Sequence, residues 1–421
     1  MSDHKPTDLR RRFALEVVRK LRAAGHEAYW AGGCVRDELL GLQPKDYDVA
    51  TSAPPERVRH VFGCRRTITI GAAFGVITVL GTGAAGQIDV ATFREDEEYR
   101  DGRHPERVVY STAERDAQRR DFTINGMFYD PERHEVIDFV GGRDDLRREL
   151  VRAIGDPRER FREDKLRMLR AVRFSATFAF TLEATTGQAI REMATEIVVV
   201  SAERIAAEFR RMFESPNRAT ALRLLDETSL LNVLLPEVAL LARSDGDRSG
   251  WESTLGVLER LGAASFPLAL AALLHRVGGP SLAAGLGRRW RLANKETDRT
   301  AWLLDRLPAV AEASRSPWPA VQRLLVSEGI KQLLALREAI SGADDPQLRF
   351  CHEKLALPAD QLNPSPLIGG DDLIARGIPP GRQIGRLLDQ IRDAQLLGRV
   401  TSRDDAMAMA DRLLDSEAEP P

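Results

Sequence analysis

The sequence changes character near residue 142, and this change limits the folds that the chain can adopt. Before it, short β-branched and apolar runs alternate with glycines, a pattern typical of strands in a small mixed sheet. After it, leucine, alanine and arginine recur at helical spacing to the end of the chain. A chain of 421 residues is too long to fold around a single compact core, so the sequence predicts an α+β head followed by separate, all-helical domains.

The head pattern predicts an order of elements. Helices are expected over 8–24, after Gly33 as far as Gly41, and from Ser52–Pro55 onward. Strands are expected over 26–31, 45–51, 67–70, 74–80, 87–93 and 135–139, with a strand or helix edge over 121–129. The segment 95–118 is highly charged and has no clean period, so we expect a mobile loop there.

Composition excludes several classes of protein. The three cysteines are far apart and form no CxxC pair, which argues against a disulfide framework or zinc ribbon and favours a reducing cytoplasm. The N-terminus lacks an apolar signal core, and the longest apolar runs are too short to cross a membrane. The net charge of −2 gives no global basic field, so any nucleic-acid surface must come from local arginine clusters.

Three carboxylates suggest a metal site. Asp46 and Asp48 are two residues apart on an expected strand, so their side chains should share one face. Hard oxygen ligands suit Mg²⁺, which shares its remaining positions with substrate phosphates. Asp89, within an apolar strand, is costly to bury alone and would complete the three carboxylates of two-metal phosphoryl transfer. Taken alone, the Asp46–Asp48 pair fits a solvated turn better.

A glycine pair precedes these carboxylates. Gly32 and Gly33 lie between an expected strand and helix, where backbone N–H groups can form an anion site. Arg36, in the first helical turn, can add a charge-assisted contact to a triphosphate. An isolated glycine pair is more often a plain strand-to-helix turn.

A second charged segment is Arg119-Arg120-Asp121-Phe122-Thr123-Ile124-Asn125. Its two arginines, with Asp121 and Asn125, could hold phosphates and a ribose hydroxyl. A charged entry into a strand explains the same residues equally well.

The run from Arg160 to Phe174 predicts one helix that can read a base. Asp164 and Arg167 are i,i+3 neighbours, and a carboxylate beside a guanidinium matches the amino donor and ring-nitrogen acceptor of cytosine or adenine. Guanine and uracil present the reverse pattern and should be rejected. Arg170 and Arg173 continue the row and suit phosphates or tRNA. The alternative is a salt-bridged helix surface, because Glu163 and Arg167 are an i,i+4 pair.

Taken in order, these segments resemble the class II tRNA nucleotidyltransferases, the CCA-adding enzymes, and their bacterial poly(A) polymerase relatives. Each motif is weak alone, but the ordered set is highly specific and covers residues 28–180 densely. The matching pieces are GGCVRDELLG, KDYDVAT, IGAAFGVITV, IDVATFR, YRDGRHP, RRDFTINGM, FVGGRDDL and GDPRERFREDKLRMLRAVRF.

The resemblance implies a polymerase-β-like head over 1–142, a helical neck with the base-recognition helix over 143–215, a body over 216–310 and a tRNA-binding tail over 311–421. It implies Mg²⁺-dependent addition of CMP and AMP from CTP and ATP to the 3′ end of tRNA, without a template. The residues it assigns are Asp46, Asp48 and Asp89 as metal ligands, Gly33 and Arg36 at the triphosphate, Arg120 and Asp121 near the nucleotide and its ribose, Asp164 and Arg167 as the template for the base, and Arg170 and Arg173 as further nucleotide contacts.

Within the family, the tRNA branch fits best. The segment 95–118, with Asp101-Gly102-Arg103-His104-Pro105, resembles the full-length loop needed for A addition, which CC-only relatives have shortened. Residues 70–75 lack the basic signature usual in the poly(A) polymerases. An A-adding enzyme has nearly the same catalytic core and stays an alternative, as does a poly(A) polymerase.

Two readings from other classes are weaker. A catalytically silent RNA-binding protein would not need the intact carboxylates, phosphate turn and template pair. A metal-dependent HD phosphohydrolase resembles the region around Trp251 and His275, but Ser253 and Arg276 stand where its first histidine and its aspartate belong. Since a cation cannot replace a metal-binding carboxylate, we expect a decayed site that serves as scaffold.

Overall fold

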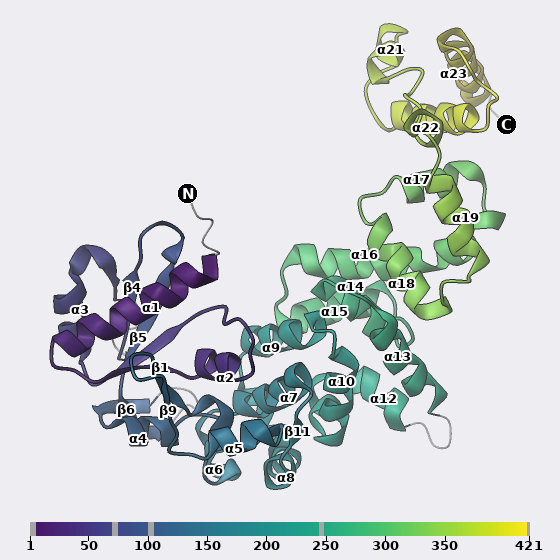
Figure 1. Ribbon diagram of the computed structural model, residues 1–421. Helices are drawn as coiled ribbons and strands as arrows, with labels where there is room; N and C mark the ends of the chain where they lie inside the picture. Colours follow the sequence, from purple (N-terminus) through teal and green to yellow (C-terminus); the bar gives the residue numbers. More distant parts are fainter. Residues whose placement is uncertain (1–5, 70–74, 100–104, 244–247, 419–421) are drawn as a thin grey trace. The chain divides into compact units, whose positions relative to one another are not determined.

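The computed structural model describes residues 6–69, 75–99, 105–243 and 248–418. The chain forms two compact units, Met1–Arg248 and Ser249–Pro421 (Figure 1). Every strand among the described residues belongs to the first unit, and the second is helical. The predicted α+β head followed by helices is therefore confirmed. No described helix combines the length and apolar character needed to cross a membrane.

The first unit begins with the elements of the head. They are α1 (Pro6–Ala23), β1 (Ala28–Ala31), α2 (Gly33–Leu39), β2 (Asp48–Thr51), α3 (Pro55–Phe62), η1 (Cys64–Arg66), β3 (Thr67–Ile68), β4 (Val76–Leu80), η3 (Gly83–Ala85), β5 (Gln87–Thr92), β6 (Arg94–Tyr99), β7 (Pro105–Tyr110), α4 (Ala113–Gln118), η4 (Thr123–Asn125), β8 (Phe128–Asp130) and β9 (Glu135–Ile137).

Mostly helical elements complete this unit. They are α5 (Gly142–Arg147), β10 (Leu150–Val151), α6 (Pro157–Glu163), α7 (Leu166–Phe178), β11 (Thr181–Leu182), α8 (Ala184–Met193), η5 (Ala194–Val199), α9 (Ala202–Glu214), α10 (Arg218–Glu227), α11 (Leu230–Leu234) and α12 (Pro236–Arg243).

The second unit is helical over its described residues, 249–418. Its helices are α13 (Ser249–Arg260), α14 (Phe266–Leu274), α15 (Pro280–Trp290), α16 (Asn294–Ala311), η6 (Ala313–Arg315), α17 (Trp318–Leu325), α18 (Ile330–Ser341), α19 (Pro346–Leu355), α20 (Ala359–Leu362), α21 (Gly370–Ala375), α22 (Arg382–Leu396) and α23 (Arg403–Ala418).

The head is built on a seven-stranded sheet in the order β3-β4-β5-β2-β1-β8-β9. Only β2 and β5 run parallel, and their register places Asp48 opposite Asp89. Along both strands, buried residues such as Val49 and Val90 alternate with these aspartates, because successive side chains point to opposite faces. The sheet therefore sets the two carboxylates side by side on one face.

Helices cover both faces of this sheet. The apolar stripe of α1, which includes Phe13, Val17 and Leu21, is buried against β1, β2 and β5. On the face shared by Asp48, α4 packs through Ala113 and Ala117 into a cluster with Phe93 and Phe128. Helices α1 and α4 therefore pack against opposite faces of the sheet that carries Asp48 and Asp89.

One strand prediction needs correction. The expected strand 45–51 begins only at Asp48, so Asp46 lies in the irregular segment before β2. Asp89 lies within β5 as expected; its side chain is exposed and accepts a 2.6 Å hydrogen bond from Thr78 Oγ1. The strand ends expected within 70–74 lie outside the described residues.

The segment 95–118, predicted to be a loop, is mostly ordered secondary structure. β6 and β7 pair as an antiparallel hairpin, in which Arg94 faces Tyr110, and α4 follows. The charged side chains gave no strand pattern, but β6 and β7 are joined by backbone hydrogen bonds, which do not depend on side-chain type. Helix α4 begins after Thr112, whose side chain caps it by accepting from Arg115 N. The Asp101–His104 part of the predicted loop lies outside the described residues.

The single helix predicted from Arg160 to Phe174 is two helices, α6 and α7. Asp164 interrupts it with an extended backbone, φ −148° and ψ 106°, and its side chain accepts from Leu166 N at 3.0 Å. Aspartate readily forms such local bonds in place of helical ones. A parallel pair of two-residue strands, β10 and β11, also falls in the region predicted to be entirely helical.

Candidate active site

A cleft of about 520 Å³ lies within the first unit and gathers most of the predicted site residues. Eleven of the thirteen line it, although they come from four separate stretches of sequence; Asp46 and Asp89 are not in its lining. The lining residues are Gly32, Gly33, Arg36, Asp48, Arg119, Arg120, Asp121, Asn125, Asp164, Leu166, Arg167, Arg170, Arg173, Phe174 and Arg204. Seven arginines against three aspartates make the cleft suited to a polyanion.

The glycine turn between β1 and α2 allows an arginine to approach the backbone. Gly32 has φ +74°, which favours glycine, and a Cβ there would lie 3.1 Å from Arg120 Nη1. Arg120 is in turn 5.0 Å from the centre of the Phe128 ring. The glycine thus leaves space for a cation beside the start of α2.

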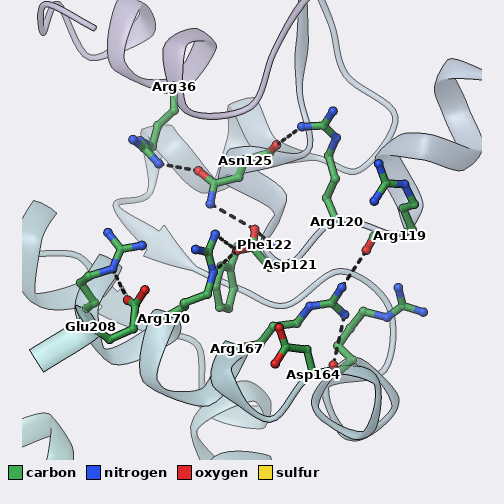
Figure 2. A network of polar contacts seen from close by, with 12 residues as sticks. Arg36, Arg119, Arg120, Asp121, Phe122, Asn125, Asp164, Arg167, Arg170 and Glu208 are labelled. Carbon is green, nitrogen blue, oxygen red and sulfur yellow. Dashed lines mark hydrogen bonds and ion pairs between the residues drawn. The ribbon is translucent and has the colours of Figure 1, made fainter. Parts of the chain in front are cut away.

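A continuous polar network joins α2 to α7 across the cleft (Figure 2). Arg36 Nη1 donates to Asn125 Oδ1 at 2.5 Å, and Asn125 Nδ2 donates to Asp121 Oδ1 at 3.2 Å. Arg170 completes it with two bonds to Asp121 Oδ2, at 2.8 and 2.5 Å. Each side chain is therefore fixed by the next.

Asp121 is the centre of this network. Burial alone would raise the pKa of its carboxyl, but the charge and hydrogen bonds of Arg170, with the Asn125 amide, lower it from 3.8 to about 2. Asp121 is therefore ionised at neutral pH, and Arg170 stays in place beside it.

The two arginines after α4 share one buried carboxylate. Asp116 is 1% exposed; Arg119 Nε donates to its Oδ1 at 2.9 Å, and Arg120 Nη2 donates to its Oδ2 at 2.9 Å. These arginines lower the pKa of Asp116 although burial opposes the shift. Asp116 thus sets the direction of both guanidinium groups.

The predicted base-reading pair is held by other residues and not as a mutual pair. Asp164 Oδ2 accepts from Arg204 Nη2 of α9 at 2.6 Å. Arg167 donates to Glu163 Oε2 at 2.5 Å and to the Arg119 carbonyl at 3.1 Å. Both side chains still line the cleft, and a carboxylate can accept a further hydrogen bond while it holds Arg204.

Arg173 is likewise positioned by α9. Its Nε donates to Glu208 Oε2 at 2.5 Å, and its guanidinium lies 3.9 Å from the centre of the Phe174 ring. Glu208 is 3% exposed, so Arg173 supplies the partner that a buried carboxylate requires.

The three predicted metal ligands differ in position, because Asp48 lines the cleft and Asp46 and Asp89 do not. Asp48 opens into the cleft, but surrounding protein reduces its hydration; this, with the charges of Asp89 and Asp46, raises its pKa to about 6 while Arg120 opposes. Asp46 has an 86% exposed side chain and lies 3.6 Å from Arg10. Within the described ranges no three metal-ligating side chains come together. The neighbouring oxygen donors of Asp48 and Asp89 nevertheless fit a divalent cation, which would relieve the repulsion between the two carboxylates.

Sequence reasoning missed three residues that fix the site: Asp116, Arg204 and Glu208. Glu208 left a signal, because it lies within the apolar stripe of α9 between Ile205 and Phe209, where an acid needs a cationic partner. The identity of that partner, 35 residues away in sequence, comes only from the fold.

Two family models match this chain. One, described as "Poly A polymerase head domain", covers residues 28–152. The other, described as "Probable RNA and SrmB- binding site of polymerase A", covers residues 179–241. The first match spans the sheet of the head and its glycine turn.

Relatives match almost the whole chain. A CCA-adding enzyme of Geobacillus stearothermophilus is 36% identical over 402 residues, covering 92% of this chain and 93% of the relative. The chain belongs to the CCA-adding enzyme family. A family member from Lacticaseibacillus paracasei is 34% identical and covers 91% of this chain and 92% of its own.

The fold agrees with this family. A crystal structure of the Bacillus stearothermophilus CCA-adding enzyme in complex with CTP superposes with a TM-score of 0.76, at 31% identity, over 97% of this chain and 98% of that one. The chain is accordingly a nucleotidyltransferase, and enzymes of this kind generally use a divalent metal.

Proposed function

We propose that this chain adds CMP and AMP, without a nucleic-acid template, to the 3′ end of tRNA, using CTP and ATP and releasing pyrophosphate. One observation carries the proposal: a single cleft is lined by Asp48 of β2, by an arginine-rich wall and by the Asp164 and Arg167 side chains. This combination provides for metal binding, triphosphate binding and base selection in one place.

The arginine-rich wall would hold the nucleotide. Arg36, Arg120 and Arg170 can contact the triphosphate, because all three line the cleft and a guanidinium forms strong bonds to phosphate oxygens. Asp121 and Asn125, fixed in the network of Figure 2, would contact the ribose hydroxyls. The tRNA 3′-hydroxyl then attacks the α-phosphorus, and the bond to the pyrophosphate oxygen breaks.

Asp164 and Arg167 would choose the base. Asp164 can accept from the amino group of cytosine or adenine while Arg167 donates to the neighbouring ring nitrogen. Arg204 and Glu163 hold these two side chains in place, which favours readout by protein groups alone. Arg173 adds a further cation on the same wall.

Mg²⁺ is the metal we propose, with Asp46, Asp48 and Asp89 as its ligands. When bound, it would lower the pKa of the attacking hydroxyl and neutralise charge on the leaving pyrophosphate. Asp48 and Asp89 are already neighbours in register, whereas the exposed Asp46 side chain contacts Arg10.

We further propose that the chain acts in the cytoplasm and is organised as a head over 1–142, a neck over 143–215, a body over 216–310 and a tRNA-binding tail over 311–421. In the body, Arg276 Nη1 donates to Ser253 Oγ at 3.3 Å, so the two residues that stand where an HD hydrolase has metal ligands contact each other. This contact supports a purely structural role for that region.

Extension of three tRNA substrates tests the function. Purified protein with Mg²⁺, CTP and ATP should extend tRNA ending before CCA by three nucleotides, tRNA ending in C by two and tRNA ending in CC by one. UTP and GTP should not be incorporated. Sequencing of the product ends identifies the added bases.

Other outcomes would replace the proposal. Extension of the CC-ended tRNA alone would identify an A-adding enzyme. Long A tracts on unrelated RNA would identify a poly(A) polymerase. Addition of two C residues without a final A would show that the 94–118 segment, with its hairpin and α4, does not support A addition.

A further inference from the structure

Asp46 is in contact with the first helix of the chain. It lies in the irregular segment before β2, and its Oδ1 is 3.6 Å from Arg10 Nη1 of α1. The same Nη1 donates to the Lys45 carbonyl at 2.5 Å. Arg10 therefore binds both the backbone and the side chain of the segment that carries Asp46.

Arg10 also reaches the turn that leads to Asp89. A Cβ placed on Gly86, just before β5, would lie 3.6 Å from Arg10 Nε. That Nε is buried and has no hydrogen-bond partner among the described residues. An unpaired buried donor is unfavourable, so the present position of the Arg10 side chain is not stabilised by a hydrogen bond from Nε.

The neighbouring residue, Tyr47, is held by Glu38 of α2, which Arg11 of α1 also contacts. Its hydroxyl donates to Glu38 Oε1 at 2.7 Å, and Arg11 Nε donates to the same oxygen at 2.9 Å. The Tyr47 ring packs on Trp30 at 4.9 Å between centroids. Tyr47 is thus fixed. Asp46 is exposed, and among the described residues its ionic contact is with Arg10 alone, so its side chain can rotate while the segment stays in place.

We propose that Arg10 is a positioning residue that holds the Asp46 carboxylate until a divalent cation enters. The Asp46 carboxylate exchanges one cationic partner, Arg10, for another, the metal ion. Arg10 therefore competes with the metal for one ligand, and removing Arg10 strengthens metal binding. The inference rests on the metal-ligand assignment in the proposed function, although its test needs no catalysis.

Binding of Mn²⁺, measured by the electron paramagnetic resonance signal of the free ion, tests the inference. Arg10→Ala should bind Mn²⁺ about two- to fivefold more tightly than the unmodified protein, the range that an exposed ion pair supports. Arg19→Ala is the matched control, because Arg19 lies on the same helix in an exposed ion pair with Glu132. Its Mn²⁺ affinity should not change.

A second background separates competition for Asp46 from a general charge effect. In Asp46→Asn protein, Arg10→Ala should no longer change Mn²⁺ affinity; a gain that persists there means simple removal of a nearby positive charge and overturns the proposal. Equal or weaker binding by Arg10→Ala alone also overturns it. If Asp46→Asn binds Mn²⁺ as tightly as the unmodified protein, Asp46 is not a ligand, and both this inference and the metal assignment fail. Loss of binding in Asp46→Asn without an effect of Arg10→Ala removes the inference only.

Discussion

Asp48 and Asp121 line the same cleft, yet their carboxyl pKa values move in opposite directions. Desolvation and the charge of Asp89 raise the pKa of Asp48 to about 6. Asp121, although more enclosed, has its pKa lowered to about 2 by Arg170. The difference follows from the partners, because a cation adjoins one carboxylate and a second carboxylate adjoins the other.

This contrast separates the proposed metal side of the site from the proposed nucleotide side. The proposed metal side consists of Asp46, Asp48 and Asp89, of which only Asp48 lines the cleft. On the proposed nucleotide side, the arginines contact protein carboxylates and are therefore held in place without a ligand. On the proposed metal side the carboxylates repel one another, and a bound cation would complete the site. Variants on the two sides should therefore fail in different ways.

The largest effect is expected on the metal side. Asp48→Asn should lower kcat for C addition by about a thousandfold, because a metal ion contributes several kcal/mol to the transition state of phosphoryl transfer. CTP binding, measured by calorimetry, should not weaken, since a negative charge has left a cleft that binds a polyanion. Removal of divalent metal with EDTA should match this loss.

The control for Asp48→Asn is Asp144→Asn, an exposed aspartate paired with Arg147 on α5. It should keep full activity. A strong loss of CTP binding in Asp48→Asn, or activity near that of the unmodified protein, would contradict the division into two sides.

The next effect is on stability. Asp121→Asn keeps the shape of the side chain but removes the charge that Arg170 faces through two hydrogen bonds. We expect urea unfolding at neutral pH to show a loss of about 3 kcal/mol, because bonds to charged groups contribute more than neutral ones and Arg170 loses its partner.

The pH dependence of that loss identifies its cause. The folded-state pKa of Asp121 lies below its ordinary value of 3.8, so its stabilisation is full above pH 4 and is lost as the pH falls toward 2. The stability difference between Asp121→Asn and the unmodified protein should therefore shrink by about 1 kcal/mol between about pH 6 and pH 3. A difference that stays constant would assign the loss to packing.

A smaller effect separates base reading from phosphate binding. Arg167→Ala should reduce discrimination of CTP over UTP about thirtyfold, since one bidentate base contact contributes roughly 2 kcal/mol of specificity. The KM for CTP should change less than this ratio. Arg162→Ala, an exposed arginine outside the cleft lining, is the control. Unchanged discrimination would exclude Arg167 from the template role.

Local patterns predicted much of the head correctly. The stripe of Phe13, Val17 and Leu21 identified α1, and the glycine at residue 41 marked the end of α2. The alternation over 87–92 identified β5. Such periodicity reflects burial against a neighbouring element, and so it can be recognised without knowing which element that is.

Other features depend on partners that are distant in sequence. Asp164 ends α6 because its side chain bonds to Leu166 N and to Arg204, 40 residues later. Periodicity across 160–174 carried no sign of that interruption. Asp46 is likewise contacted by Arg10 of α1, a helix that no sequence pattern connects with the proposed metal ligands.

The smallest effect concerns the orientation of the Arg119 and Arg120 side chains. Asp116→Asn keeps an acceptor for Arg119 and Arg120 but removes the charge that fixes them. We expect KM for CTP and ATP to rise together by about fivefold, corresponding to roughly 1 kcal/mol from a weakened charged hydrogen bond. Steady-state kinetics with both nucleotides measure this.

Glu114→Gln, an exposed residue on the same helix, controls for general effects on α4 and should leave both KM values unchanged. The choice between CTP and UTP should also stay the same in Asp116→Asn, because Asp116 contacts the arginines at the start of the 119–125 segment and not Asp164. If discrimination between CTP and UTP falls while KM rises, the effect of Asp116 reaches Arg167 through the Arg119 carbonyl. The orientation of Arg119 and Arg120 and the selection of the base are then coupled.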